Sequence, residues 1–139
     1  MGKDSANRSE LAKKAGGRVV KSELRYVIAY IAGRAISHAN SSAVYDYDTG
    51  SYKQLSGQIT PSSVRVFDYG TGSHISGNGT PAKWNLFHFG LGTHLSLTLT
   101  GNQFRGFDYG EGTHFSGRVS GKSVSLFDYS DSSYHNFSI

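Results

Sequence analysis

The chain has 139 residues, a formal net charge of +4, no cysteine, and 18 glycines against two prolines. This is the length of a single domain, and the lack of cysteine excludes a disulfide framework and a thiolate metal site. Nine tyrosines, eight phenylalanines and one tryptophan provide enough large apolar side chains to exclude a wholly disordered chain.

Residues 1–18 are predicted to form a basic, flexible arm. Residues 1–40 carry eight Lys or Arg side chains and three acidic ones, whereas the rest of the chain carries six basic and seven acidic side chains. Such an arm can attract nucleic acid or anionic lipid, but we expect it to be solvated. We see no secretory signal, and the apolar run YVIAYIA is far shorter than the ~20 residues that span a bilayer. We therefore expect a cytoplasmic location and no membrane span.

Residues 19–40 are predicted to contain a helix from about Ser22, a good N-cap, to Ile36. Apolar side chains recur in this segment at helical spacing, at Leu24, Val27, Ile28, Ile31 and Ala35. We expect the helix to pack on the sheet that follows, to cap one end of it or to plug a barrel.

Residues 41–139 contain five copies of one sequence pattern. The tripeptide Phe-Asp-Tyr or a variant of it recurs every 20 residues, at 67–69, 87–89, 107–109 and 127–129, and Tyr-Asp-Tyr at 45–47 is an earlier copy. In each copy the residue types alternate with a period of two along two arms, which is typical of β-strands. A four-residue turn such as GEGT would join the two arms and set Tyr109 opposite His114. Two-residue tips such as Gly121-Lys122 would join successive copies as type II′ turns and set Val119 opposite Val124.

This alternation predicts a sheet with two different faces. One face is aliphatic and consists of Val64, Val66, Ile75, Leu86, Leu95, Leu97, Leu99, Val119, Val124, Leu126, Phe137 and Ile139. The other face is aromatic and polar, with one row of rings at Tyr45, Phe67, Phe87, Phe107 and Phe127 and a second row at Tyr47, Tyr69, Phe89, Tyr109 and Tyr129.

Two architectures fit this pattern. In an antiparallel meander, open or closed into a barrel, consecutive strands pair directly, which suits the two-residue glycine turns. In a β-solenoid each 20-residue unit is one coil, which suits the regular period. We predict an all-β fold of five two-stranded repeats of about 20 residues in an antiparallel meander or barrel, with the β-solenoid as the alternative, preceded by one N-terminal helix.

Several recurring polar residues have a structural explanation. Asp46, Asp68, Asp108 and Asp128 precede the longer turns, where we expect their carboxylates to accept hydrogen bonds from turn amides. A paired-carboxylate site is the alternative. The glycine-rich turns are not phosphate loops, because no helix follows them.

His74, His94 and His114 occupy the same position in three successive repeats. Stacked in a solenoid they would lie within reach of one metal ion, but in a meander they would be roughly 9–10 Å apart, which is twice the strand spacing. We expect them to pack edge-on against the facing rings of Tyr69, Phe89 and Tyr109. A catalytic triad is a single constellation, so a repeated Asp, His and Ser set indicates structure. We therefore predict no catalytic residue, no metal and no cofactor.

The aromatic and polar face suggests a non-enzymatic binding or assembly module. Rings beside Arg can hold sugars or bases, but the charge of the repeats argues against nucleic acid. We expect a carbohydrate or protein partner, or a second copy of the chain. The candidate ligand-binding residues are Tyr69, His74, Phe89, His94, Arg105, Tyr109, His114 and Tyr129.

The alternative hypothesis is a small-ligand- or metal-binding barrel, or a hydrolase-like enzyme, with an internal site lined by Tyr, His and Arg. The direction of the aromatic face distinguishes the two hypotheses. Rings inside a closed cavity would favour a small ligand, whereas rings on an outer face would favour a partner or polymer surface.

In their general pattern, 20-residue hairpin repeats rich in aromatic residues and glycine resemble the wall-binding repeat modules of choline-binding bacterial proteins. Those repeats are rich in tryptophan and carry a Gly-Trp signature. The phrase FDYGTGSH contains neither, and the sole tryptophan of this chain is Trp84. The resemblance therefore concerns the design of the repeat and assigns no site residue.

Overall fold

The structure is a computed structural model, and it describes residues 22–139. The predicted basic arm at 1–18 lies outside the described residues, as do residues 19–21. The described chain begins with a helix, α2 (Ser22–Ser37), and continues with ten strands. The strands are β1 (Ala43–Asp46), β2 (Ser51–Ile59), β3 (Ser63–Asp68), β4 (Ser73–Thr80), β5 (Lys83–His88), β6 (Thr93–Thr100), β7 (Gln103–Asp108), β8 (Thr113–Ser120), β9 (Ser123–Asp128) and β10 (Ser133–Ser138).

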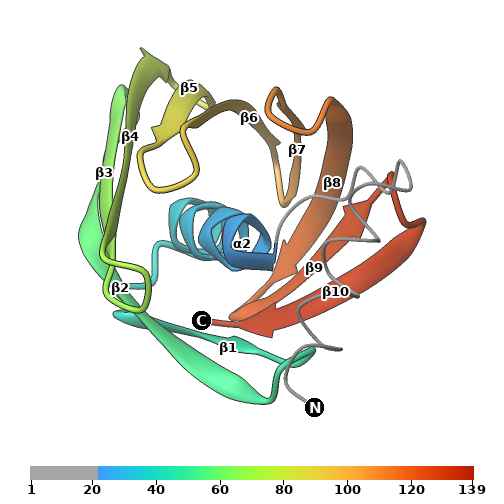
Figure 1. Cartoon of the computed structure of the whole chain (residues 1–139). Coiled ribbons are helices and arrows are strands. Elements are labelled where there is room, and N and C mark those ends of the chain that lie inside the picture. The colour runs from blue at the N-terminus through green and yellow to red at the C-terminus, as the bar shows by residue number, and fades with distance from the viewer. Residues whose placement is uncertain (1–21) are drawn as a thin grey trace.

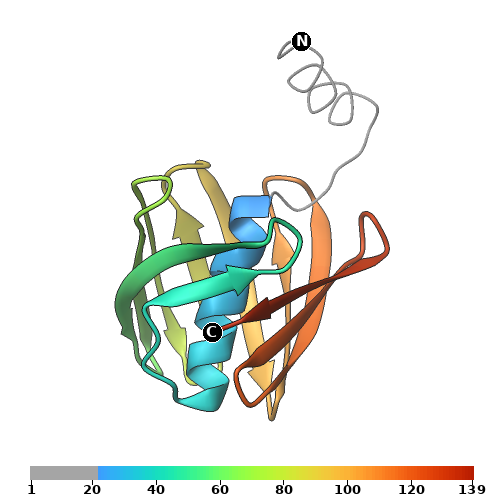
Figure 2. The same cartoon turned by 90° about the horizontal axis from the view of Figure 1, so that it is seen from below.

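The ten strands form a closed antiparallel barrel. Each strand pairs with its neighbours in the chain, and β1 pairs with β10 to close the circle. The predicted all-β meander is confirmed and the β-solenoid alternative is wrong, because consecutive strands run antiparallel and pair directly. Figure 1 looks into the barrel and shows α2 in its centre, and Figure 2 shows the same helix from the side, within the wall of strands.

The two ends of the barrel differ in their connections. At one end, here called the loop end, four residues join the two strands of each hairpin, as at 69–72 and 109–112. At the opposite end, the tip end, residues 60–62 join the first two hairpins, and two-residue turns such as Gly121-Lys122 join the later ones. α2 begins at the loop end, because Arg25 and Tyr26 contact Asp128 and Asp68 at the last residues of β9 and β3.

The register of the sheet agrees with the prediction at the tips but not at the longer loops. Val119 pairs with Val124 as expected. At the loop end Phe107, and not Tyr109, pairs with His114, because β7 ends at Asp108 and Tyr109 is the first loop residue. A shift of two residues leaves every side chain on its predicted face, since side chains alternate with a period of two.

The aliphatic face points inward and packs on α2. Its residues are buried, apart from the half-buried Leu99 and Ile139. The helix itself is buried on all sides, at Leu24, Tyr26, Val27, Ile28, Ala29, Tyr30, Ile31, Ala32 and Gly33. About eight strands enclose a space that side chains alone can fill, so a barrel of ten strands needs the helix to complete its core.

Two glycines leave room for aromatic rings inside the barrel. Phe115 lies over Gly106 of the neighbouring strand, and Phe104 lies over Gly117. A Cβ atom added to Gly106 would lie 2.4 Å from Cζ of Phe115, and one added to Gly117 would lie 2.2 Å from Cζ of Phe104. The missing side chains therefore make room for the two inward rings.

Replacement of Leu97 by alanine should lower the free energy of unfolding by about 2–5 kcal/mol, because the fully buried side chain would leave a cavity. Urea denaturation measures this loss. The exposed Ser123 is the control, and its replacement by alanine should change the free energy by less than about 0.5 kcal/mol. Similar losses for both variants would contradict the assignment of the faces.

Ser132→Gly should stabilise the protein by roughly 0.5–1 kcal/mol, because Ser132 has a φ of 53° in the left-handed region that favours glycine. The equivalent position of the second repeat is Gly72, with a φ of 67° and open space around its Cα. The reciprocal change Gly72→Ser should destabilise by a similar amount. Thermal melts of the two variants check the pair, and a loss of stability in Ser132→Gly would contradict the argument.

Candidate functional site

All eight residues predicted to bind a ligand lie on the outside of the barrel. Tyr69, Phe89, Tyr109 and Tyr129 are between 53% and 61% exposed. His74, His94, Arg105 and His114 are exposed as well. The alternative hypothesis placed such residues inside the barrel, but α2 occupies that space (Figure 1).

Within one hairpin an inner ring, Phe107, contacts two of these predicted residues, Tyr109 and His114. The centroid of the Phe107 ring lies 4.8 Å from that of Tyr109, two residues along the chain, and 4.7 Å from that of His114 on the paired strand. Both contacts are edge-to-face, the arrangement that aromatic pairs prefer. Phe107 is half-buried and the other two rings are exposed. The inner ring thus holds the two outer rings in place.

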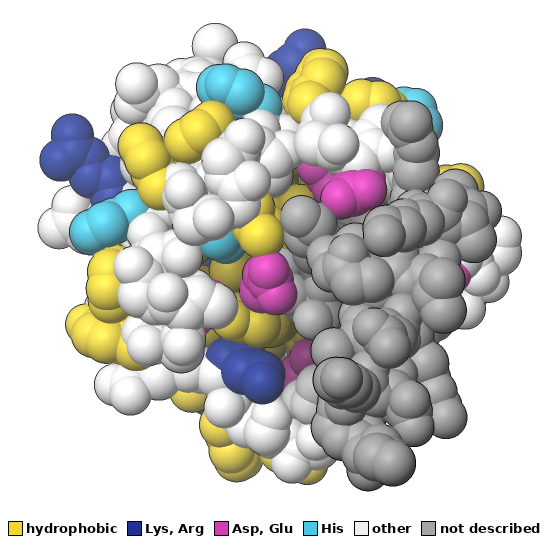
Figure 3. All heavy atoms as spheres, in the orientation of Figure 1, with side chains coloured by type: hydrophobic (Ala, Val, Ile, Leu, Met, Phe, Trp, Pro, Cys, Tyr) yellow, Lys and Arg dark blue, Asp and Glu magenta, His cyan; other side chains and the backbone are white. Residues whose placement is uncertain are grey.

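The same arrangement occurs in all five hairpins, and we call each set an aromatic triad. The triads are Tyr45, Tyr47 and Tyr52; Phe67, Tyr69 and His74; Phe87, Phe89 and His94; Phe107, Tyr109 and His114; and Phe127, Tyr129 and Tyr134. They surround the barrel near the loop end. Figure 3 shows histidine and hydrophobic side chains side by side at the periphery of this end, with acidic side chains nearer its centre.

The triads explain the repeated histidines. His74, His94 and His114 lie on β4, β6 and β8, with another strand between each pair. Two strand spacings correspond to roughly 9–10 Å, whereas ligand bonds to a metal ion are about 2 Å long. Each imidazole packs on the phenylalanine of its own triad. The predicted partners, Tyr69, Phe89 and Tyr109, are wrong, because the register at the loop end is shifted by two residues.

Two shallow grooves on the outer wall have equivalent linings. One has a volume of about 540 Å³ and is lined by Ser56, Gly57, Arg65, Val66, Phe67, His74, Ile75, Ser76 and Phe89. The other has a volume of about 580 Å³ and is lined by Ser96, Thr98, Arg105, Gly106, Phe107, His114, Phe115, Ser116 and Tyr129. Most of these positions correspond at a spacing of 40 residues, which is two repeats.

The floor of each groove follows from the strand register. Phe67 pairs with Ser56 on one side and His74 on the other, and Arg65 pairs with Ser76. In the second groove Phe107 lies between Ser96 and His114, and Arg105 pairs with Ser116. The sequence prediction included Arg105 but not Arg65 among the site residues. The signal that identifies both is the 40-residue spacing of arginines at one position of the repeat.

The inner face carries a ring of acidic groups at the loop end. Asp46, Asp68, Asp108 and Asp128 are buried, and His88, which is also buried, occupies the third of the five equivalent positions. Each carboxylate accepts a backbone N–H from its own loop at 2.9–3.0 Å, and the Nδ1 atom of His88 accepts the N–H of Leu91 at 3.1 Å. The predicted structural role is confirmed. These hydrogen bonds shape the loops.

Two of these carboxylates also fasten α2. The Tyr26 hydroxyl donates a hydrogen bond to Asp68, and burial together with this carboxylate raises the pKa of Tyr26, which keeps the donor protonated. The Arg25 guanidinium lies 3.3 Å from Oδ2 of Asp128. Carboxylates at the first turns of a helix also interact favourably with its dipole.

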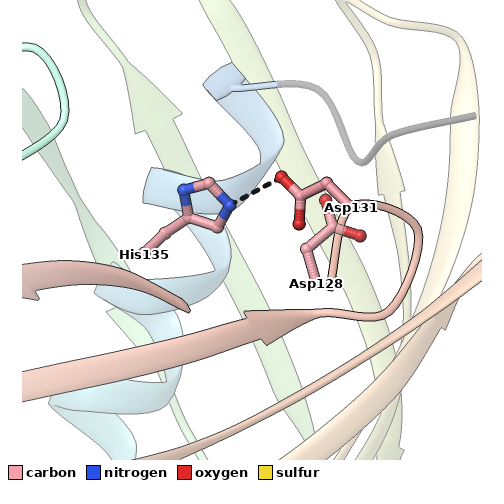
Figure 4. Close-up of side chains that lie close together, drawn as sticks. All are labelled: Asp128, Asp131 and His135. Atoms are coloured by element: carbon pink, nitrogen blue, oxygen red, sulfur yellow. Dashed lines mark hydrogen bonds and ion pairs between the residues drawn. The ribbon is translucent and has the colours of Figure 1, made fainter. Parts of the chain in front are cut away.

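A cluster of ionisable groups lies where the barrel closes. His135, on β10, contacts Asp48 of the β1–β2 loop through Nδ1, and its Nε2 atom lies 3.0 Å from Oδ2 of Asp131. Figure 4 shows that Asp131 points toward this imidazole and that Asp128 lies beside Asp131. Donor atoms of Asp128, Asp131 and His135 lie within 4.8 Å of one another, a spacing that could admit a metal ion.

The Arg25 guanidinium already occupies the space beside these carboxylates, at 3.3 Å from Asp128 and 3.5 Å from Asp131. A metal ion would have to displace this charge. We therefore interpret the cluster as an ion-pair network that joins α2, β9 and β10 and connects β10 to the β1–β2 loop. Sequence reasoning missed it, because it brings together residues from both ends of the described chain.

No protein-family model, curated protein or solved structure matches this chain. Among residues 22–139, no helix combines the length and the apolar content that crossing a membrane requires.

Asp108→Asn should stabilise the protein more at pH 7 than at pH 4. Burial raises the pKa of Asp108, although hydrogen bonds from Gly110, Glu111 and Thr93 act in the opposite direction. A raised carboxyl pKa contributes stability below the pKa of the unfolded chain, and that contribution is lost as pH rises through the folded pKa. Asparagine keeps the acceptor oxygen without the charge. Urea denaturation at both pH values measures the difference.

Asp128→Asn is the matched control, because it removes the charge that faces Arg25. This variant should be destabilised at pH 7, by about 1–3 kcal/mol. A difference between Asp108→Asn and the wild type that does not change with pH would contradict the prediction.

Proposed function

We propose that the protein is a non-enzymatic carbohydrate-binding module that holds its ligand on the outer wall of the barrel. The observation that carries this proposal is the pair of repeat-related grooves, in each of which aromatic rings lie beside a guanidinium, an imidazole and hydroxyl groups. A sugar ring has apolar C–H faces and hydroxyl groups around its edge. Aromatic rings suit the faces, and hydrogen-bonding side chains suit the edge.

Neighbouring rings fix the exposed rings of the grooves before a ligand binds. Phe89 is 59% exposed and packs edge-on against Phe87 at 4.8 Å. Tyr129 is 56% exposed and packs in the same way against Phe127 at 5.0 Å. A ring that neighbours already fix loses little conformational entropy on binding, which favours affinity.

Repetition supports binding over catalysis. Every His or Ser of the triads and grooves has counterparts in other repeats, and these residues lie on an outer wall. Nucleophilic and acid–base catalysis need one oriented set of groups. A surface that repeats one polar and aromatic arrangement suits a ligand that repeats its own units.

Other partners would use the same rings. Seven large aromatic side chains are more than half exposed, at Tyr47, Tyr52, Tyr69, Phe89, Tyr109, Tyr129 and Tyr134. A protein partner or a second copy of this chain could cover them, and burial of exposed apolar patches drives such association. The cytoplasmic location stays a prediction from the sequence.

The double variant Phe89→Ala, Tyr129→Ala should weaken binding to polysaccharides about tenfold or more, which corresponds to the loss of about 1.4 kcal/mol. A polysaccharide array probed with the purified wild type identifies ligands, and titration calorimetry compares the variants. The control is Tyr52→Ala, because Tyr52 is 74% exposed but lines neither groove.

Equal losses in the control and the double variant would contradict the role of the grooves. Failure of the wild type to bind any polysaccharide of the array would contradict the proposed function. Light scattering of the wild type tests the competing use of the rings, and a stable dimer that the double variant abolishes would favour assembly over carbohydrate binding.

A further inference from the structure

The charge of the outer wall differs from that of the repeats as a whole. The seven acidic residues of 41–139 are either buried inside the barrel, at Asp46, Asp68, Asp108 and Asp128, or placed in the loops, at Asp48, Glu111 and Asp131. The outward positions of the ten strands therefore carry no acidic side chain, whereas four basic ones lie there, at Arg65, Lys83, Arg105 and Arg118. The wall is basic although the repeats together have a slight excess of acid.

Arg65 and Arg105 are exposed, and the guanidinium of neither makes a hydrogen bond or ion pair with any other residue of the described chain 22–139. Each lies in a groove, beside the serine with which it pairs in the sheet and two residues from the ring of a triad. A guanidinium presents a planar fork of N–H donors that matches a carboxylate in two parallel hydrogen bonds. Two unpaired guanidinium groups in equivalent surroundings indicate a ligand with an acidic group.

We infer that the ligand is an acidic polysaccharide, and that Arg65 and Arg105 bind the carboxylates of its sugar units in two equivalent sites. This inference rests on the proposed carbohydrate-binding function and names the ligand class. In each site the exposed ring, Phe89 or Tyr129, contacts the face of a sugar. The serine hydroxyls and the imidazole of His74 or His114 bind its hydroxyl groups.

The repeats between and after these sites lack the arginine. Asn85 occupies the corresponding position of the third repeat, and Ser125 that of the fifth. The two sites therefore lie on β3 and β7, four strands apart in a barrel of ten. They face different sides of the molecule, so that one protein joins two chains of the polymer or two distant segments of one chain.

A single-stranded nucleic acid is the competing ligand, since rings and arginines also bind bases and phosphates. The arrangement favours the sugar acid. Backbone neutralisation needs a series of closely spaced cations, whereas the two arginines are four strands apart, roughly 19 Å along the wall at 4.8 Å per strand. Each groove holds one cation, which suits one carboxylate.

The test is titration calorimetry of the full chain with polygalacturonate, alginate and hyaluronate, each compared with the same polymer after its carboxyl groups are reduced to alcohols. We expect at least one of the acidic polymers to bind about tenfold more tightly than its reduced form, because only the acid pairs with the guanidinium. The single variants Arg65→Gln and Arg105→Gln should each halve the number of sites, and the double variant should lose the preference for the acid.

Arg118→Gln is the matched control, because Arg118 is an exposed arginine of the same wall that lines neither groove. It should bind like the wild type. A loss in this variant equal to that of Arg65→Gln would mean unspecific attraction by charge and would overturn the inference.

Two outcomes separate this inference from the proposed function. If acidic and reduced polymers bind equally and only the double variant Phe89→Ala, Tyr129→Ala weakens them, the carboxylate site is wrong while carbohydrate binding stands. If no polysaccharide binds and an oligothymidylate does, both are wrong and nucleic acid is the ligand.

Discussion

The burial of α2 along the barrel axis is the constraint on which the rest of this structure depends. A ring of ten strands encloses more space than its own inward side chains fill, and a helix buried on all sides supplies the missing apolar volume. Once the aliphatic face is committed to that helix, the aromatic and polar face must lie outside. Arg25 and Tyr26 also tie the helix to carboxylates at the loop end, so the same packing fixes the loops next to the triads.

Much of this arrangement could be predicted because one sequence pattern recurs five times in the chain. A period of two within each arm assigned side chains to faces, and five copies of the pattern made that assignment consistent. The helix was predicted from Ser22 to Ile36 and observed at Ser22–Ser37. The register predicted at the loops differs by two residues from the observed one. The assignment of side chains to the two faces is still correct, because a shift of two residues leaves each side chain on the same face of a strand.

The closure of the barrel and the grooves could not be predicted in this way, because they depend on contacts between distant segments. The closing strands β1 and β10 form two residue pairs, and no turn of the sequence joins them. By contrast, β9 and β10 are joined by a turn and form six residue pairs. The run YVIAYIA has no polar side, which indicates a helix that is buried on all sides. The prediction considered only the apolar residues at helical spacing and therefore left the position of the helix open. Arg65 is a candidate site residue because its position corresponds to that of Arg105 in a second groove. The ion-pair network of His135 occurs once and has no repeated sequence pattern.

The separation of the two faces has a consequence for how such a protein can change over generations. Side chains that hold the barrel together point inward, and those proposed to recognise a ligand point outward from the same strands, so mutation can act on one set and spare the other. The third repeat differs from its neighbours at the arginine position by the single residue Asn85. The number of proposed binding sites on the wall can therefore rise or fall by single substitutions, while the fold is inherited unchanged.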